Sequence, residues 1–316
     1  MTKAVVIAAL LYGVLPSVAT GQGQNPSPMV ETTRRHERLT PGSPAGVMRT
    51  VPGPGDRTVD VFVPAATVAT ERVTVVIHFH GAAWIPHQAV ALLENNAVSA
   101  VVNLGAGSSV YDRAFSDPTA FTEVLRRMER EVALVLGTSS LRTDVALVAF
   151  SAGHGAVRAI LRDSAAAAPV SSVLLLDGMH TSYVPAGTVL ADSGSLDTRN
   201  LAEFAAFARA AISGDRRFLI THSEIFPGTF ASTTETADWL LNELGLKRTA
   251  VLEWGPRGMQ QLSRVQAGGF EVLGYAGNSA PDHVDHLHAL PELLARLFGR
   301  SQPSGNEGRT PAARGR

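Results

Sequence analysis

The sequence predicts an α/β fold in which helices cover both faces of a mostly parallel sheet. Short apolar segments alternate with helical segments at least five times, as expected for parallel strands joined by helical crossovers. Several of these segments are apolar throughout, which is typical of strands buried on both faces. The 316 residues are 45% hydrophobic and only 17% charged, so the chain has enough apolar material for one large core.

The predicted elements follow one another from residue 57 to residue 298. In the first strand valines alternate with other residues, and a Pro-Gly turn at 52–56 indicates a hairpin with the preceding segment. Helix 118–136 has the clearest helical signal, because Pro118 stands near its start and its apolar residues recur on one face. The expected strands are 57–64, 73–80, 100–104, 145–150, 173–176, 218–221 and 270–275, and the expected helices are 86–95, 118–136, 152–162, 201–212, 234–244 and 286–298.

The two ends of the chain differ in composition from the segment between them. The N-terminus has the pattern of a secretory signal, with Lys3, an apolar run, and small residues up to Ala19. The apolar run is shorter than the about 20 residues that span a bilayer. We therefore expect export, to the periplasm or the medium, with no stable membrane span after processing. The expected organisation is a signal peptide at 1–21, a flexible leader at 22–44, one folded domain at 45–300 and a disordered tail at 301–316.

The composition excludes several classes of function. With 27 basic and 28 acidic residues the net charge is −1, so no basic surface for nucleic acid or an anionic membrane is indicated. The chain has no cysteine, which rules out disulfides, thiolate metal sites and a cysteine nucleophile. No phosphate-binding glycine loop or dinucleotide fingerprint occurs. We therefore expect no cofactor and no nucleic-acid partner.

The most informative residue is Ser151, which stands between strand 145–150 and helix 152–162. In a parallel sheet, ligands bind at the carboxyl ends of the strands. A nucleophile in a tight strand-to-helix turn needs small residues two positions before and after it, where strand and helix approach closely. Ala149 and Gly153 meet that demand, and the helix N-terminus stabilises developing negative charge. The alternative interpretation is that Ser151 only caps the helix.

These features resemble the α/β-hydrolase superfamily, whose pattern around the nucleophile is Gly-x-Ser-x-Gly. Ala149 stands in place of the first glycine, a departure that keeps the steric requirement. The resemblance extends over about residues 57–300, through strand order and separately placed motifs. It implies an α/β-hydrolase-like sheet with a short lid-like insertion at 178–216. It also implies a serine esterase or lipase-like activity that passes through an acyl-enzyme intermediate, with a small-molecule or polymeric ester as substrate.

A second motif, His-Phe-His-Gly-Ala-Ala-Trp at 78–84, looks like the His-Gly signature of lipases and esterases. The resemblance implies that the backbone N–H groups of Ala82 and Ala152 hold the oxyanion, while Gly81 lets the backbone approach the substrate. Trp84 is either an apolar wall at the mouth of the cleft or an ordinary half-buried aromatic residue.

A metal site must also be considered, because His78 and His80 are two residues apart on one strand and could face the same ion. A catalytic zinc site usually has three protein ligands, and a third would have to come from elsewhere in the chain, such as His222 or His180. We therefore expect no metal, and we expect His80 to orient the oxyanion loop.

The resemblance places the general base after the last strand, and three histidines crowd that place. His283 is preferred because it comes first, on the loop side, and His286 is the alternative. His288 is interpreted as a solvated helical residue.

Two carboxylates compete for the role of the acid. Asp177 ends an apolar strand, so its carboxylate would be buried and would need a partner such as the imidazole. Glu224 follows the next strand, which is the more usual place in the family, and the choice stays open. Three other hypotheses also remain: a serine peptidase on the same fold, a non-catalytic relative, and a metal-dependent hydrolase that uses the histidine-rich rim.

Overall fold

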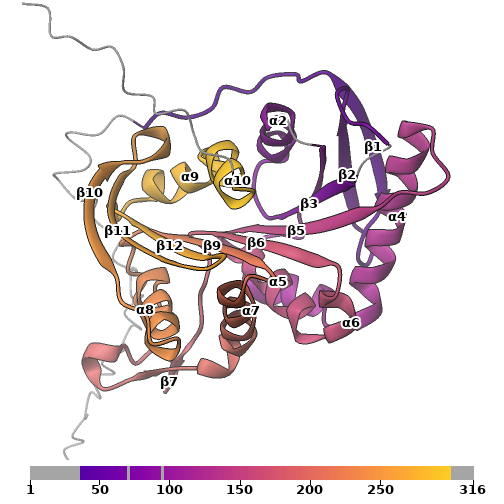
Figure 1. Ribbon diagram of the computed structural model, residues 1–316. Coiled ribbons are helices and arrows are strands. Elements are labelled where there is room, and N and C mark those ends of the chain that lie inside the picture. The colour runs from indigo at the N-terminus through magenta and orange to yellow at the C-terminus, as the bar shows by residue number, and fades with distance from the viewer. Residues whose placement is uncertain (1–35, 70–71, 94–95, 300–316) are drawn as a thin grey trace, which may run out of the picture.

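The computed structural model describes residues 36–69, 72–93 and 96–299 (Figure 1). The predicted signal peptide and C-terminal tail lie outside these residues. Within the described part of the chain, no helix is long and apolar enough to cross a membrane.

The centre of the fold is a ten-stranded sheet whose six middle strands are parallel. Antiparallel strands flank them on both sides. The strand order therefore confirms the predicted fold class. From one edge to the other the strands are β1 (Gly46–Pro52), β2 (Thr58–Pro64), β4 (Ala97–Val102), β3 (Val73–Phe79), β5 (Thr143–Phe150), β6 (Val170–Leu176), β9 (Arg217–His222), β12 (Phe270–Tyr275), β11 (Gln260–Ala267) and β10 (Thr249–Trp254).

Helices cover both faces of the sheet and enclose one apolar core on each (Figure 1). One face carries α2 (Trp84–Leu92), α9 (Ala280–His288) and α10 (Leu290–Leu297). The other carries α3 (Ser108–Ala114), α4 (Pro118–Leu136), α5 (His154–Arg162), α6 (Ser164–Ala167), α7 (Ala202–Ser213) and α8 (Thr233–Glu243).

Strand β5 shows why the middle strands read as continuous apolar runs. Its residues alternate between the two cores, with Leu147 and Ala149 on the α5 side and Val148 and Phe150 on the α9 side. Because both faces are covered, no position along the strand selects a polar side chain. The last two residues, Ala149 and Phe150, thus point to opposite faces just before Ser151.

Helix α9 begins earlier than the sequence analysis expected. Ser279 and Asp282 form a capping box, in which each side chain accepts a hydrogen bond from the backbone N–H of the other residue, and Pro281 fits the first turn of a helix. The helix therefore starts at Ala280 rather than at 286. As a result His283 lies within the helix, not in the loop before it.

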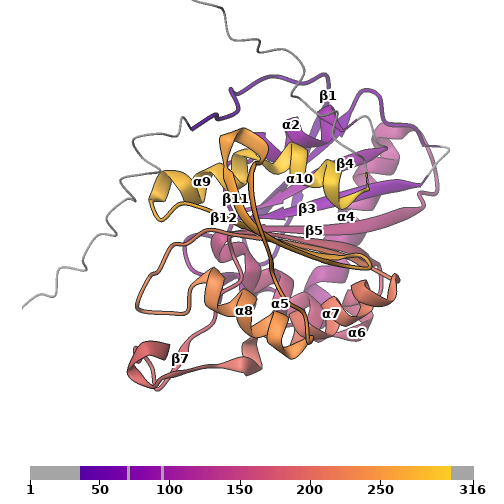
Figure 2. The ribbon, with the colours of Figure 1, turned by 60° about the vertical axis from the view of Figure 1, so that its left-hand side comes forward.

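The hairpin of β10 and β11, together with α3, was not predicted. The hairpin carries few buried residues, and Leu252 and Trp254 are 75% and 67% exposed. A strand that packs little apolar surface gives a weak periodic signal. The hairpin extends the sheet beyond β12 and curves away from its plane (Figure 2).

The last part of the predicted flexible leader packs on the domain. Leu39 belongs to the α9-side core, while His36 and Arg38 both hydrogen-bond to Asp285 on α9. The expectation of flexibility is therefore wrong for residues 36–42, and the earlier part of the leader lies outside the described residues. The overlooked signal was an apolar residue, Leu39, that follows the basic residues His36 and Arg38 in an otherwise polar stretch.

The insertion at 178–216 has two parts. The first part contains a two-stranded ribbon of β7 (Tyr183–Val184) and β8 (Ser195–Leu196). The second part is α7, whose Phe204 and Phe207 are buried in the core beneath the sheet. The lid-like portion is thus confined to the stretch before α7, and α7 is an ordinary crossover helix.

Candidate active site

Ser151 occupies a strained turn between β5 and the helical segment that leads into α5. Its φ is +49°, in the left-handed region that serine rarely adopts. His80 at the end of β3 and Asp177 at the end of β6 also have positive φ, of 73° and 42°. Such conformations cost on the order of 1–3 kcal/mol each and cluster at functional sites. Three such residues follow the adjacent strands β3, β5 and β6, so the carboxyl ends of these strands are the candidate functional region.

Glycines allow the segments around Ser151 to approach one another. A Cβ on Gly153 would lie 2.2 Å from the carbonyl oxygen of Phe79, and one on Gly178 would lie 2.8 Å from the backbone N and O of Ser151. The loops after β3 and β6 therefore both contact the turn at Ser151. The requirement for small residues that the sequence analysis assigned to the turn thus has a structural cause.

The structure brings His283 and Asp177 together. Nδ1 of His283 lies 2.7 Å from Oδ2 of Asp177. The imidazole ring packs on Phe150, the residue before Ser151, with ring centroids 4.5 Å apart. The His283 side chain is 25% exposed and that of Asp177 only 2%. The imidazole therefore contacts both a buried carboxylate and the aromatic ring of the residue that precedes the strained turn.

Asp177 is held as a carboxylate by the groups around it. Its two oxygens accept hydrogen bonds from the backbone N–H and hydroxyl of Ser223, at 2.9 and 2.7 Å, and from the hydroxyl of Thr233 at 2.6 Å. Burial alone would raise the pKa of Asp177, but the nearby His286 and the hydrogen bond with His283 outweigh it and hold the pKa well below its usual value. The site thus contains a buried anion next to an imidazole.

Glu224, the competing carboxylate, lies elsewhere. Its side chain is exposed, and its backbone N–H and carboxylate pair with the backbone of Gly277, at 2.9 and 3.4 Å. In the described part of the chain, no hydrogen bond joins Glu224 to His283. The structure therefore places Asp177, and not Glu224, beside the imidazole.

The alternative histidines also have other surroundings. His286 is buried, lies 2.8 Å through Nδ1 from the hydroxyl of Thr221, and packs on Tyr275. His288 accepts a hydrogen bond from the backbone of Leu39 and contacts the ring of Trp84. His288 is thus half-buried, not solvated as expected. His283 is the one of the three beside Asp177 and Phe150.

The loop after β3 lies over the turn. Gly81 has a φ of +115°, and a Cβ there would lie 2.9 Å from Leu287 and 3.5 Å from Phe150. Ala82 follows it, and Ala152 is the second residue of the helical turn η1 (Ser151–Gly153), where backbone N–H groups lack intrahelical partners. Trp84 is the first residue of α2 and is partly buried against the α9-side core. Of its two interpretations, this agrees with an ordinary half-buried aromatic residue.

One ring nitrogen of His78 and one of His80 contact neighbouring groups. His78 is fully buried, and its Nε2 lies 2.7 Å from the carbonyl oxygen of His80. Nδ1 of His80 lies 3.0 Å from the hydroxyl of Tyr111. Because His80 leaves the strand at positive φ, the alternation that would align the two rings ends there.

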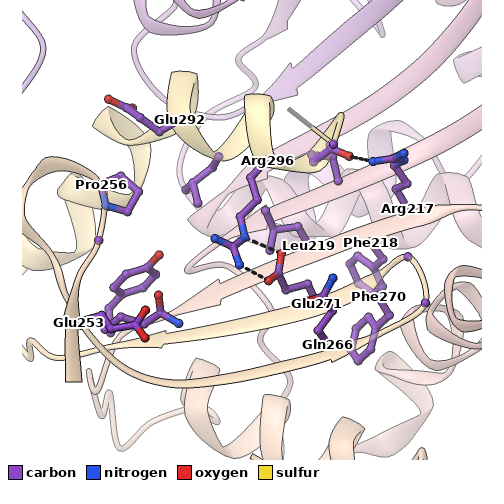
Figure 3. A pocket seen from close by; sticks show the side chains of 18 of the residues that line it. Arg217, Phe218, Leu219, Glu253, Pro256, Gln266, Phe270, Glu271, Glu292 and Arg296 are labelled. Atoms are coloured by element: carbon purple, nitrogen blue, oxygen red, sulfur yellow. Dashed lines mark hydrogen bonds and ion pairs between the residues drawn. The ribbon is translucent and has the colours of Figure 1, made fainter. Parts of the chain in front are cut away.

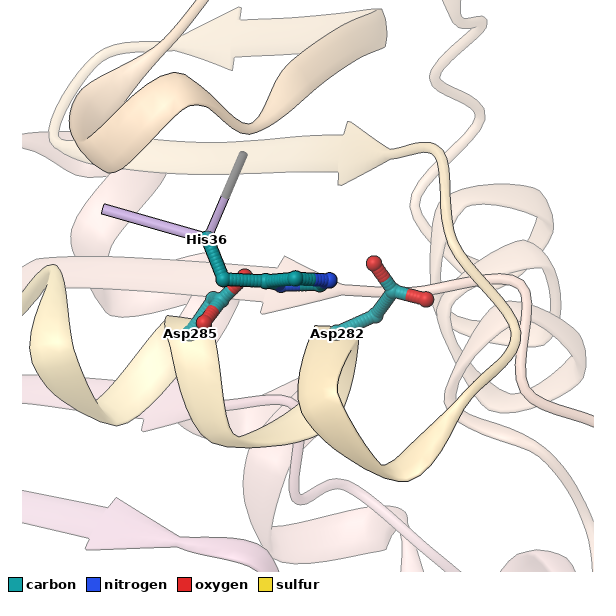
Figure 4. A group of neighbouring side chains, drawn as sticks. All are labelled: His36, Asp282 and Asp285. Carbon is teal, nitrogen blue, oxygen red and sulfur yellow. The ribbon is translucent and has the colours of Figure 1, made fainter. Parts of the chain in front are cut away.

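One group of described side chains has metal-ligand spacing: His36, Asp282 and Asp285, with one ligand atom each within 4.8 Å (Figure 4). Asp285 binds His36 and Arg38 at 2.5 and 3.0 Å, and Asp282 caps α9. Both oxygens of Asp285 are thus already in contact with basic side chains. These contacts explain the group as the attachment of residues 36–38 to α9.

A groove of about 720 Å³ lies between α10 and the strands β11 and β12 (Figure 3). An ion pair between Arg296 and Glu271 crosses it, with one N–O distance of 2.7 Å. None of the residues assigned to the candidate site lines this groove. It is therefore a separate feature of the sheet extension.

The sequence analysis missed Ser223 and Thr233, which hold Asp177. Ser223 directly follows β9 and could have been noticed as a polar residue at a strand end. Thr233 is the first residue of α8, ten positions later, and no local pattern connects it to Asp177.

Three buried histidines make the stability sensitive to acid. Burial lowers the pKa of His78 and His154 from 6.5 to about 3, and that of His222 to about 4. In the unfolded chain these groups take up protons near 6.5, so between pH 6.5 and 4 the unfolded state binds more protons. As the pH decreases through this range, we expect these three histidines alone to lower the free energy of unfolding with a slope approaching three protons, about 1.4 kcal/mol per pH unit for each.

Chemical denaturation at a series of pH values between 7 and 4 measures this slope. In the variant His222→Gln, the slope should decrease by about one proton. A free energy of unfolding that stays constant over this range would contradict burial of these histidines in the neutral form.

No family model matches the sequence, and no curated protein matches it. Solved structures resemble it at low sequence identity. The feruloyl esterase module of Clostridium thermocellum, complexed with sinapinate, is 13% identical, with 85% of this chain and 93% of that chain covered and a TM-score of 0.45. Carboxyl esterase 2 of Tuber melanosporum is 14% identical, with 82% and 88% covered and a TM-score of 0.45. A thermophilic esterase of Thermogutta terrifontis is 13% identical, with 83% and 95% covered and a TM-score of 0.46.

Proposed function

We propose that this protein is a serine hydrolase that cleaves carboxylic esters through an acyl-enzyme intermediate. The observation that carries the proposal is the 2.7 Å contact between buried Asp177 and His283, whose ring packs on Phe150, the residue before the strained turn at Ser151. A serine is a poor nucleophile unless a base takes its proton. An imidazole oriented by a carboxylate is the base that suits this task.

In the first half of the reaction, Oγ of Ser151 attacks the carbonyl carbon of the ester while Nε2 of His283 takes the hydroxyl proton. The carbonyl π bond opens and its electron pair moves to the oxygen. The N–H groups of Ala82 and Ala152 donate hydrogen bonds to this oxyanion. When the tetrahedral intermediate collapses, the C–O bond to the alcohol breaks and His283 returns the proton to the leaving alcohol.

In the second half, water replaces the alcohol. His283 takes a proton from water as it attacks the acyl carbon, and the proton then goes to Oγ of Ser151 as the acid leaves. Asp177 keeps the Nδ1–H of His283 in place and stabilises the imidazolium in both halves. Since Asp177 has a lowered pKa and further donors on its oxygens, it remains an anion throughout.

Competition between water and hydroxylamine tests the acyl-enzyme route. Esters of one acid with several alcohols are hydrolysed in the presence of hydroxylamine, and the acid and hydroxamate are quantified. A common acyl-enzyme requires the same product ratio for every alcohol. A ratio that changes with the alcohol would contradict the intermediate, and no turnover of any ester would contradict the esterase proposal.

We also propose that the chain is exported, on the basis of the signal pattern from Lys3 to Ala19. N-terminal sequencing of secreted material should find a mature chain that begins near Thr20 or Gln22. Intact Met1 on protein recovered from the cytoplasm would contradict export.

A further inference from the structure

In the loop between β3 and α2, the side-chain amide of Asn103 holds Gly81 through both its oxygen and its nitrogen. Its Oδ1 accepts a hydrogen bond from the backbone N–H of Gly81 at 3.0 Å, and its Nδ2 donates one to the carbonyl oxygen of Gly81 at 2.9 Å. Asn103 directly follows β4, and the last residue of β4, Val102, pairs with Phe79 at the end of β3. The side chain therefore reaches Gly81 from the neighbouring strand.

These contacts fix two successive peptide groups. The His80–Gly81 peptide is held at its carbonyl oxygen by Nε2 of His78, at 2.7 Å, and at its N–H by Asn103. The Gly81–Ala82 peptide is held at its carbonyl oxygen by Nδ2 of Asn103. In a trans peptide the N–H points opposite to the C=O. With the oxygen of Gly81 turned toward Asn103, the N–H of Ala82 must point away from Asn103.

We propose that Asn103 is a positioning residue that aims the N–H of Ala82 at the oxyanion. This inference rests on the proposed function, because it assumes that an oxyanion forms beside Ser151. Gly81 needs such support: its φ of +115° is open to glycine, which has many accessible conformations. An unrestrained peptide here could rotate and turn the Ala82 N–H out of the site.

The chemistry of asparagine fits both contacts, since its amide offers one acceptor and two donors on adjacent atoms. Aspartate has the same shape but no donor, so Asn103→Asp would place a carboxylate oxygen against the carbonyl oxygen of Gly81. Alanine removes both contacts. If the donor to Gly81 is what matters, the aspartate variant should be impaired at least as strongly as the alanine variant.

Asn96 offers a matched control. Its side chain makes the same pair of contacts to the backbone of Val68, accepting from the N–H at 2.8 Å and donating to the oxygen at 2.9 Å. Asn96 precedes β4 and Asn103 follows it, so the two side chains lie at opposite ends of this strand. Nδ2 of Asn96 also donates to the carbonyl oxygen of Arg72 at 3.1 Å. Asn96→Ala therefore removes, and Asn96→Asp weakens, a comparable backbone clamp away from Ser151.

The test measures kcat and KM for a soluble ester in the full-length Asn103→Asp, Asn103→Ala and Asn96 variants. A misplacement of about 1 Å in a catalytic group can cost about 10²-fold in rate, and the loss of a whole oxyanion donor about 10²–10³-fold. We expect kcat to fall about 10–10²-fold in both Asn103 variants, with KM within about threefold of the wild type. The Asn96 variants should keep the wild-type kcat and KM.

A second readout separates positioning from general structural damage. A trifluoromethyl ketone forms a tetrahedral oxyanion adduct, so its inhibition constant should weaken by the same factor as kcat/KM in the Asn103 variants. Melting temperatures of all variants show whether they are folded, and the aspartate variant, which preserves side-chain shape, guards against misfolding of the alanine variant.

Two outcomes would overturn the inference while leaving the proposed function intact. In one, the wild type turns over esters and the Asn103 variants match it. In the other, KM rises with unchanged kcat, which would show that Asn103 binds substrate directly. If the wild type itself neither cleaves esters nor binds the ketone, the proposed function and this inference both fail.

Discussion

Replacing Ser151 with alanine should lower the rate of ester cleavage by at least about 10³-fold, because the variant lacks the oxygen that attacks the ester. The change removes one hydroxyl from a turn whose conformation depends on backbone contacts with Gly153 and Gly178. The free energy of unfolding should therefore stay within about 1 kcal/mol of the wild type. Initial rates with a soluble ester and denaturant unfolding of the same preparations measure both quantities.

Ser193 provides the control for this substitution. It is also a serine with positive φ, of 65°, but it is exposed and follows the short helical turn at 190–192. Ser193→Ala makes the same chemical change at another serine with positive φ, and we expect near wild-type turnover. Ester cleavage that survives Ser151→Ala would show that another residue attacks.

Replacing Asp177 with asparagine should cost on the order of 10⁴-fold in kcat, as amide replacement of a triad acid can. The amide cannot stabilise an imidazolium, and its NH2 group would face donors from Ser223, Thr233 or His283. Glu224→Gln makes the same chemical change in an exposed carboxylate and should cost under about tenfold. His283→Ala should be as damaging as Ser151→Ala, because triad members act as a unit.

The two amide variants are compared in the same background, with rates normalised to the folded fraction, because the buried site at Asp177 is also expected to lose stability. Equal, small losses in both variants would remove Asp177 as the orienting acid. The imidazole would then act in a Ser–His dyad, or with an acid from elsewhere in the chain.

The sequence predicted the parts of the site that depend on local order along the chain. Ser151 follows a doubly buried strand and has small neighbours, and both signals lie within a few residues of it. His283 and Asp177 were also named, yet the choice between Asp177 and Glu224 could not be made. That choice depends on which loop faces α9, and α9 began six residues earlier than expected because its capping box was overlooked.

Other features depend on contacts between distant segments and gave no local signal. Thr233 and Asp177 are 56 residues apart, and Asn103 and Gly81 are 22 apart. Thr233, Asp177 and Asn103 are ordinary polar residues at or next to the end of a helix or strand, a position where such residues commonly occur for capping and turns. Only the packing of neighbouring strands shows which of them meet.

Covalent labelling with a fluorophosphonate tests the central claim most directly. The reagent phosphonylates an activated serine: Oγ bonds to phosphorus, His283 takes the hydroxyl proton, and fluoride leaves. The account predicts one added group per chain by intact mass, located on Ser151 by peptide mapping, with none in Ser151→Ala and greatly slowed labelling in His283→Ala and Asp177→Asn. Efficient ester turnover without labelling at Ser151, or labelling at another residue that abolishes turnover, would contradict the account.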